Sequence, residues 1–388
     1  MKDAPATASP SAWPPKGVQP AGEEADRPIR VMVVDDSHFM CWLLTRWIGE
    51  APGLELAGTA SSGAEAVATI ARKQPDIVLL DLEMPDMGGL EALPALQKAW
   101  PSAKVIVVSA LTKDNAALVL DALSRGAVDY VSKPRASGDM SSGQDFRKAL
   151  FKRIEALMRP AEPQTRNVLA RPEPRPAVRG AGKTSAELHP FSMVVPRVIG
   201  IGSSTGGPEA LLRFLTPLAP DLVRVPVLIA QHMPAEFTAT LAARLAAATG
   251  LPAKEGEDGE PIQPGHIYVA PGDRHMTLVS SAQPSIAISD EPPLRYYRPS
   301  VDLLFRSLVA VFGPAVLGVV LTGMGTDGFE GAGLISYAGG SVVVQDRASS
   351  VVWGMPGATS KAGYASAEDR PERLAEIVSG LFQRERMR

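Results

Sequence analysis

Short apolar runs alternate with helix-like segments along most of the chain, and this alternation limits the possible folds more than any other feature of the sequence. Its first part contains the runs IRVMVV, LELAG, DIVLL, KVIVVS and AVDYVS. Runs that are apolar at nearly every position are typical of strands buried on both faces of a parallel sheet, with helices as connections. Five such units predict a flavodoxin-like α/β domain with five parallel strands.

A second alternation of the same kind runs from Arg197 to the end of the sequence. Its apolar runs are RVIGIG, VPVLIAQ, AVLGVVLTG and GSVVVQD, and the stretch HIYVAPGDRHMTLV between the second and third has the pattern of a β-hairpin. We therefore predict a second doubly wound α/β domain with a mostly parallel sheet.

The remaining segments lack this periodicity and set the expected domain boundaries. Residues 1–28 are rich in Pro and Ala with little to bury, which predicts a disordered tail. After a last helix near residues 143–158, Pro and Arg replace the apolar residues, and we expect an extended, solvated linker over residues 159–196. The two folded domains are then expected over residues 29–158 and 197–388.

Composition and charge argue against several classes of protein. The sequence has 388 residues, 45% hydrophobic and 21% charged, and its formal net charge of −3 gives no basic footprint for nucleic acid. No window approaches the roughly 18 consecutive apolar residues of a membrane span, and the first residues lack the apolar core of a signal peptide. We expect a cytoplasmic protein with no nucleic-acid partner and no membrane insertion. The single cysteine, Cys41, excludes an internal disulfide.

Polar side chains follow four strands of the first domain at the points where the strands end. Asp35 and Asp36 follow the first strand, and Asp81 follows the third. The carboxyl ends of parallel strands meet at one edge of a sheet, and clustered carboxylates suit Mg²⁺ and can accept a phosphoryl group. Ser109 and Lys133 end the fourth and fifth strands with a hydroxyl and a cation that can bind phosphoryl oxygens.

The stretches VMVVDDS, DIVLLDLEMPDMGG, VIVVSALT and AVDYVSKP resemble the receiver domains of two-component response regulators over about residues 29–135. This resemblance implies Asp81 as the phosphorylation site, Asp35 and Asp36 with Asp81 as ligands of Mg²⁺, and the hydroxyl and cation noted above as phosphoryl-switch residues. Gly88 departs from the aspartate usual in the family, which puts the geometry of that loop in question.

The second domain opens with a glycine-rich turn around two serines, in the stretch VIGIGSSTGGPEALL. Within it, Ser204 lies at the centre of a G-x-S-x-G pattern, where flanking glycines remove side chains that would block a substrate. Such a turn can carry a nucleophile, or it can be a plain strand-to-helix turn without catalysis.

A histidine and an acid at the ends of other strands could complete a proton-transfer chain with Ser204. Asp327 lies in the loop after AVLGVVLTG, and His232 directly follows the buried run VPVLIA. His266 and His275 flank the hairpin-like stretch, where a structural role is the default. The chain order Ser, His, Asp differs from that of α/β-hydrolases, so the serine turn does not by itself imply their fold.

Two other interpretations stay open on these residues alone. The segment 323–328 satisfies the pattern G-x-G-x-x-G, and Asp346 follows the next strand at about the place of a ribose-binding acid, which would indicate a dinucleotide-binding oxidoreductase gated by the first domain. Asp327 argues against it, because a carboxylate in that loop would repel a pyrophosphate. A non-catalytic, phosphorylation-regulated binding module is the other alternative.

The stretches GIGSSTGGPEAL, AQHMPAEFT, EDGEPIQPGHIYVAPGDRHM, RPSVDLLF and VVLTGMGTDG look like the catalytic domain of chemotaxis protein-glutamate methylesterases over roughly residues 197–383. The resemblance implies an α/β hydrolase-type domain with Ser204 as nucleophile, His232 as base and Asp327 as the acid that orients the base. Around Thr205, backbone N–H groups would face the oxyanion, and Met324 would line the pocket.

The resemblance to the methylesterase family also implies the substrates and partners of this protein. The substrates would be methylated chemoreceptors, with receptor glutamines deamidated by the same chemistry and without a cofactor for the esterase step. A chemotaxis histidine kinase would be the phosphodonor, and the unphosphorylated receiver would restrict access to the catalytic face.

Overall fold

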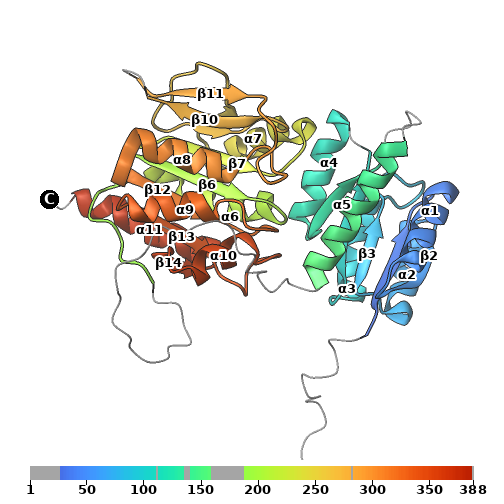
Figure 1. Ribbon diagram of the computed structural model, residues 1–388. Helices are drawn as coiled ribbons and strands as arrows, with labels where there is room; N and C mark the ends of the chain where they lie inside the picture. Colours follow the sequence, from blue (N-terminus) through green and yellow to red (C-terminus); the bar gives the residue numbers. More distant parts are fainter. Residues whose placement is uncertain (1–26, 111, 135–139, 159–187, 281–282, 387–388) are drawn as a thin grey trace, which may run out of the picture.

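The computed structural model describes residues 27–110, 112–134, 140–158, 188–280 and 283–386 (Figure 1). The expected disordered tail lies outside the described residues except for its last two, and so does the expected linker up to residue 187. The end of the linker region lies against the second domain, because the N–H of His189 donates to the carbonyl of Ala365 (2.8 Å) and that of Ser192 to Oγ of Ser341 (2.9 Å).

The first domain is a five-stranded sheet in the order β2-β1-β3-β4-β5, and its strands are parallel. The strands are β1 (Ile29–Val34), β2 (Leu54–Ala60), β3 (Ile77–Leu80), β4 (Lys104–Ser109) and β5 (Asp129–Ser132), and the helices are α1 (His38–Glu50), α2 (Gly63–Lys73), α3 (Gly89–Ala99), α4 (Lys113–Ser124) and α5 (Met140–Met158). The predicted flavodoxin-like order is confirmed.

Alternate residues of each central strand enter cores on opposite faces of this sheet. In β1, Val31 and Val33 pack with residues of α1 and α5, whereas Met32 and Val34 pack with residues of α2, α3 and α4. All four side chains are fully buried, as expected for a strand covered on both faces.

The second domain is a seven-stranded parallel sheet in the order β14-β13-β12-β6-β7-β9-β8, beside a two-stranded antiparallel sheet of β10 and β11. The strands are β6 (Val198–Ser203), β7 (Val227–Gln231), β8 (Ala253–Glu255), β9 (Ile267–Val269), β10 (His275–Val279), β11 (Ser285–Ser289), β12 (Val316–Val320), β13 (Ser341–Gln345) and β14 (Ala367–Asp369), and the helices are α6 (Gly207–Leu222), α7 (Ala235–Thr249), α8 (Val301–Phe312), η1 (Gly313–Ala315), α9 (Phe329–Tyr337), α10 (Met355–Lys361) and α11 (Pro371–Arg386). Helices α6, α7 and α11 cover one face, and α8, α9 and α10 cover the other (Figure 1).

The hairpin expected over HIYVAPGDRHMTLV is wrong. Strand β9 pairs in parallel with β7 and β8, while β10 pairs with β11, the strand that follows it. The burial of the residues explains the difference: Ile267, Tyr268 and Val269 are fully buried and suit the interior of the large sheet, whereas β10 has exposed positions and packs one face against α8.

Two glycines in β6 bring helix α8 close to the sheet. A Cβ added at Gly200 would lie 2.4 Å from Cδ1 of Leu308, and one added at Gly202 would lie 2.3 Å from Cγ1 of Val301. Any larger residue would therefore push α8 outward, and this close approach places the first turn of α8 beside the carboxyl end of β6.

The two domains are in contact, and the first domain contributes strand β5 and helix α4 to this contact (Figure 1). Helix α4 lies against α7, and the rings of Tyr130 and Phe237 are 4.9 Å apart. Arg244 forms an ion pair with Asp121 at 3.6 Å. Within the described residues, no helix is long and apolar enough to cross a membrane.

Candidate active site

Three residues predicted to act together lie at the ends of three neighbouring strands. Ser204 follows β6, His232 follows β7, and Asp327 lies in the loop between β12 and α9, with β6 between the other two strands in the sheet. The connection from β6 leads to β7 on one side, and that from the neighbouring β12 leads to β13 on the other side. Ligand sites of open α/β sheets form at such a point, beyond the carboxyl ends of the strands.

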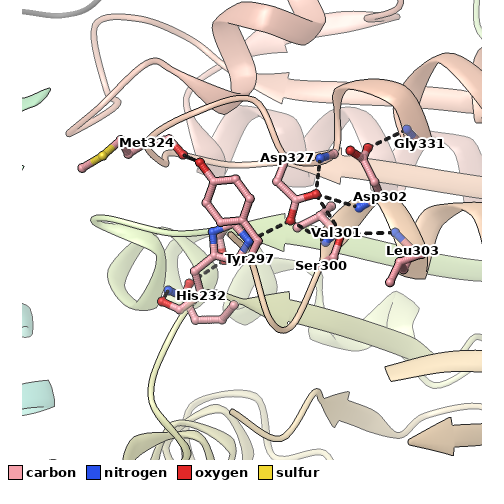
Figure 2. Close-up of polar contacts among 12 residues, drawn as sticks. His232, Tyr297, Ser300, Val301, Asp302, Leu303, Met324, Asp327 and Gly331 are labelled. Atoms are coloured by element: carbon pink, nitrogen blue, oxygen red, sulfur yellow. Dashed lines mark hydrogen bonds and ion pairs between the residues drawn. The ribbon is translucent and has the colours of Figure 1, made fainter. Parts of the chain in front are cut away.

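Asp327 and His232 form a buried hydrogen-bonded pair. Nε2 of His232 lies 2.8 Å from Oδ2 of Asp327, and the side chain of Asp327 is only 2% exposed (Figure 2). The pair is the histidine–acid contact that a serine hydrolase requires.

The carboxylate of Asp327 is fixed by the first turn of helix α8. It accepts hydrogen bonds from the N–H groups of Val301 (2.7 Å) and Asp302 (3.0 Å) and from the hydroxyl of Ser300 (3.0 Å) (Figure 2). Burial raises the pKa of Asp327, but the bond and charge of His232 together with these N–H donors outweigh it, so that the pKa lies below its ordinary value. The residue is therefore a carboxylate whenever the fold is intact near neutral pH.

The second nitrogen of His232 is free for chemistry. Since Nε2–H donates to Asp327, Nδ1 of a neutral ring carries the lone pair, and it is buried without a hydrogen-bond partner among the described residues. Among the described residues, no hydrogen bond joins the hydroxyl of Ser204 to the imidazole of His232. Catalytic contacts are often loose before substrate binds.

The two serines of the turn differ in their surroundings. Ser203 is fully buried, and its hydroxyl donates to Oε1 of Gln231 at 2.6 Å. Ser204 is partly exposed, and its N–H donates to the carbonyl of Thr322 (3.0 Å). Of the two serines, Ser204 is therefore the candidate nucleophile, while Ser203 is a small residue of the strand end.

Gln231 fastens the serine turn to the histidine loop, a role that the sequence analysis missed. Its Nε2 donates to the carbonyls of Ser204 (2.9 Å) and His232 (3.1 Å). A Cβ at Gly207 would lie 2.0 Å from Oε1 of this glutamine, which gives a steric reason for that glycine. An amide at the end of a buried run was the signal that could have pointed to Gln231.

Thr205 and Met324 both contact the first domain. The hydroxyl of Thr205 donates to Oδ2 of Asp129 in the first domain at 2.8 Å, and Arg153 forms an ion pair with the same oxygen at 3.2 Å. Met324 packs against the core that contains β1 and α5. Over the described residues, the N–H groups of Thr205 and Met324 donate to no other group of the protein.

A second buried carboxyl, Asp302, lies behind Asp327 and was also missed. Its Oδ1 accepts from the N–H of Gly331 at 2.7 Å, and its Oδ2 is buried without a partner among the described residues. Burial and the nearby charge of Asp327 raise the pKa of Asp302 to about 7, against the lowering effect of the Gly331 N–H. Asp302 is thus a protonated acid through much of the acidic range.

The residues of the dinucleotide interpretation have other partners. Oδ1 of Asp346 accepts from the N–H (2.8 Å) and the hydroxyl (2.5 Å) of Ser349, so this acid caps a turn. In the glycine-rich loop, Oδ1 of Asp327 accepts from the N–H of Gly328, the N-cap of α9, at 3.0 Å, so a carboxylate of the protein already lies at the start of the helix where a pyrophosphate would bind. His275, whose role was left as structural, is buried, and its Nδ1 accepts from the N–H of Ser300 at 3.2 Å.

The acidic residues of the first domain meet as predicted from the strand ends. Oxygens of Asp35, Asp36 and Asp81 lie within 4.8 Å of one another. Nζ of Lys133 lies 2.6 Å from Oδ2 of Asp81 and 2.9 Å from Oδ2 of Asp35. The hydroxyl of Ser109 is buried and has no hydrogen-bond partner in the described part of the chain.

This donor set fits a hard divalent cation and a phosphoryl group. Burial raises the pKa of Asp81, as does the charge of Asp35, although Lys133 acts in the opposite direction. Burial lowers the pKa of Lys133, but its bonds to the two carboxylates outweigh this and raise it, so that the amine stays charged. Carboxylate oxygens without a thiolate or imidazole are the ligands that Mg²⁺ prefers.

Two families match the two domains. The family described as CheB methylesterase matches residues 199–378, and the response regulator receiver domain family matches residues 31–142. The crystal structure of the Thermotoga maritima CheB methylesterase catalytic domain is 35% identical, covers 48% of this chain and 100% of that chain, and has a TM-score of 0.47.

Curated relatives match across both domains. The protein-glutamate methylesterase/protein-glutamine glutaminase of group 2 operon of Bradyrhizobium diazoefficiens is 42% identical over 378 residues, or 92% of this chain and 95% of that protein. Protein-glutamate methylesterase/protein-glutamine glutaminase 2 of Caulobacter vibrioides is 46% identical over 345 residues, or 87% and 94% of the two chains.

The fold and these matches define a response regulator whose output domain is a hydrolase. The chain belongs to the protein-glutamate methylesterase/protein-glutamine glutaminase family, as its motifs predicted. A receiver domain implies Mg²⁺-dependent phosphorylation in general, and the oxidoreductase and binding-module alternatives are not favoured.

Replacing Asp302 with Asn is expected to remove a pH-dependent loss of stability. The pKa of the Asp302 carboxyl is about 7 in the folded protein and about 4 in the unfolded chain. Between these two pH values, the carboxyl is protonated in the folded protein and ionised in the unfolded chain. Wild-type stability therefore falls as the pH rises from about 4 to about 7 and then levels off. Relative to wild type, the Asn variant should gain on the order of 2–4 kcal/mol of unfolding free energy across that window. Urea unfolding at several pH values measures this gain, and a pH-independent difference contradicts it.

Proposed function

We propose that this chain hydrolyses γ-glutamyl methyl esters of chemoreceptors, with Ser204 as nucleophile, His232 as base and Asp327 as the orienting acid. The observation that carries the proposal is the buried Asp327–His232 pair, in which Nδ1 of His232 has no partner among the described residues. Gln231 joins the backbone of this histidine to that of the partly exposed Ser204. The names of the curated relatives support the choice of substrate.

Nδ1 of His232 takes the proton of the Ser204 hydroxyl as Oγ attacks the ester carbon. The resulting imidazolium then gives this proton to the methoxide oxygen, methanol leaves, and the acyl group stays on Ser204. In the second half, water attacks the acyl carbon while Nδ1 of His232 takes a proton from it and passes this proton to Oγ of Ser204. The carboxylic acid so formed releases its remaining proton to solvent. Asp327 stabilises the imidazolium of His232 in both halves of the reaction, because the N–H groups at the start of α8 keep the carboxylate of Asp327 ionised.

The developing oxyanion requires hydrogen-bond donors that the protein itself does not use. The N–H groups of Thr205 and Met324 meet this condition among the described residues, and the start of α6 adds its dipole beside Thr205. Removing one such donor typically costs on the order of 3 kcal/mol of transition-state stabilisation.

The same acyl-enzyme route serves a glutamine side chain. The carboxamide carbon is attacked in place of the ester carbon, the proton from His232 goes to the nitrogen, and ammonia leaves in place of methanol. The glutaminase activity in the names of the relatives supports this second reaction.

For the receiver, we propose Asp81 as the phosphorylation site, with Asp35 and Asp36 joining it as ligands of Mg²⁺. A bound Mg²⁺ supplies positive charge that offsets the charge of the phosphoryl oxygens. Lys133 and Ser109 then pair with those oxygens, and a chemotaxis histidine kinase is the proposed donor. The distances among these residues and the unpartnered hydroxyl of Ser109 support the assignment.

The contact between the domains supports a role for the receiver in restricting access to the catalytic face. Asp129 of β5 holds the side chain of Thr205, the residue next to the nucleophile. Phosphorylation at Asp81 would draw in Ser109 and Lys133 at the ends of β4 and β5 and favour a receiver that packs less well here. A switch of this kind needs only a few kcal/mol.

Replacing Ser204 with Ala is expected to abolish ester hydrolysis, because no other hydroxyl is available to form the acyl-enzyme. Loss of the nucleophile or the histidine of a serine protease costs on the order of 10⁶ in kcat, and loss of the acid costs less. Ser204→Ala and His232→Ala should therefore exceed Asp327→Ala in severity. Methanol release from methylated chemoreceptor is the measurement, and Ser203→Ala is the matched control with mild effect. Equal activity of Ser204→Ala and wild type would exclude the triad.

Replacing Asp81 with Asn is expected to abolish stimulation by acetyl phosphate and Mg²⁺ while leaving basal hydrolysis in place, because an amide cannot attack phosphorus. Methanol release with and without the phosphodonor measures the stimulation, and mass spectrometry locates the phosphate. An Asp81→Asn protein that is still fully stimulated and carries acid-stable phosphate on a serine would overturn the assignment.

Replacing Asp129 with Ala is expected to raise the activity of the unphosphorylated protein, because it removes the acceptor that holds Thr205 against the receiver. A hydrogen bond to a charged group contributes about 1.5–3 kcal/mol, so basal methanol release should rise on the order of tenfold. Asp121→Ala is the control, since it removes the surface ion pairs of Asp121 with Arg125 and Arg244 and should change little. Unchanged basal activity in Asp129→Ala would argue against this contact as a restraint.

A further inference from the structure

A turn with unusual backbone conformation lies beside the catalytic pair. Leu294 and Tyr297 exchange two backbone hydrogen bonds, of 3.1 and 2.9 Å, across a two-residue turn. The two central residues, Arg295 (φ 50°) and Tyr296 (φ 78°), are both in the left-handed region without being glycine. Such conformations cost on the order of 1 kcal/mol or more per residue, so other contacts must stabilise the turn.

The two tyrosines of the turn differ in their surroundings. Tyr296 is 96% exposed. The ring of Tyr297 stacks on the imidazole of His232, with ring centroids 4.4 Å apart and planes inclined by 16° (Figure 2). Its hydroxyl lies 3.5 Å from the carbonyl of Met324, to which it donates. Tyr297 thus contacts both the histidine and the loop that carries Asp327.

The loop that carries Asp327 is shaped to receive this ring. A Cβ at Gly325 would lie 1.9 Å from the hydroxyl oxygen of Tyr297, and the φ of Gly325 is 84°. On the other side of the turn, Arg295 forms an ion pair with Glu330 of α9. These contacts fix the turn against the loop and account for a backbone that is otherwise unfavourable.

The imidazole of His232 needs such a restraint. The χ2 torsion of histidine is broad, and one hydrogen bond to Asp327 does not by itself stop the ring from rotating about Cβ–Cγ, a rotation that also disturbs that bond. A stacked aromatic ring confines that plane, and offset stacking contributes about 0.5–1.5 kcal/mol beyond area burial.

We propose that Tyr297 is a positioning residue for the hydrolysis: its ring holds the imidazole of His232 in the plane that directs Nε2 to Asp327 and Nδ1 to the nucleophile. This inference rests on the proposed function of His232 as the base. Tyr297 acts through His232 and needs no contact with the reacting atoms.

Tyr297 also meets the receiver. Nζ of Lys152 in α5 lies 5.8 Å from the centre of the tyrosine ring. Because phosphorylation is expected to change this contact, every variant must be compared in the same state, as full-length protein with Mg²⁺ and saturating acetyl phosphate.

The kinetic test compares three variants. Tyr297→Leu, which removes the stacked ring, should lower kcat roughly ten- to a hundredfold with little change in KM, since misplacement of a catalytic group by about 1 Å costs on the order of a hundredfold. Tyr297→Phe keeps the ring and should retain kcat within about threefold of wild type. Tyr296→Leu alters the exposed neighbour in the same turn and should match wild type. Unchanged kcat in Tyr297→Leu, or an equal loss in Tyr296→Leu, would overturn the proposal.

A second readout does not depend on activity. A histidine N–H bonded to a buried carboxylate gives a far-downfield proton resonance, and ¹⁵N-labelled histidine assigns it to Nε2 of His232. The resonance should broaden or disappear in Tyr297→Leu and persist in Tyr297→Phe and Tyr296→Leu. If it persists in Tyr297→Leu, the proposal is wrong. The resonance can be lost in Tyr297→Leu and kept in the other two variants while wild type releases no methanol. In that case, Tyr297 positions His232 as proposed, but the proposed esterase function is wrong.

Discussion

The structure of the catalytic face depends on the binding of one carboxylate by the start of one helix. Asp327 takes two backbone N–H groups and the cap hydroxyl of α8, which otherwise need partners at any helix N-terminus. The same carboxylate orients His232. Gly200 and Gly202 have no side chains to keep α8 away from β6, so α8 lies close enough to bind Asp327. The same two glycines therefore determine the packing of α8 on the sheet and, through Asp327, the orientation of His232.

Asp327 also accepts from the N–H of Gly328 at the start of α9, and this contact is related to the likeness of the preceding loop to a dinucleotide fingerprint. Both arrangements place an anion at a helix N-terminus next to a backbone with little side-chain bulk. Here the anion belongs to the protein, and Gly325 and Gly328 have positive φ angles that the loop requires to turn the aspartate inward. The pattern of glycines therefore indicates the shape of a loop, and the residue between them decides what the loop binds.

Much of the fold and most site residues could be predicted from the sequence, because they depend on local patterns. Apolar runs gave the order of the receiver strands, and strand ends placed Ser204, His232 and Asp327 at one edge. The hairpin of β9 and β10 was mispredicted because β9 joins β7 and β8 in the large sheet, and this pairing depends on residues outside the hairpin-like stretch. Gln231 and Tyr297 were missed for a similar reason: their roles come from contacts between loops far apart in the sequence.

The pairing of Tyr130 with Phe237 has a thermal consequence. The receiver and the catalytic domain meet partly through apolar surface, and near room temperature the burial of such surface is favoured mainly by entropy. Its contribution weakens on cooling, whereas the polar contact of Asp129 with Thr205 does not follow the same dependence. Cooling therefore weakens the apolar part of the contact between the domains more than its polar part, and the hydrogen bond of Thr205 to Asp129 supplies a larger share of that contact in the cold.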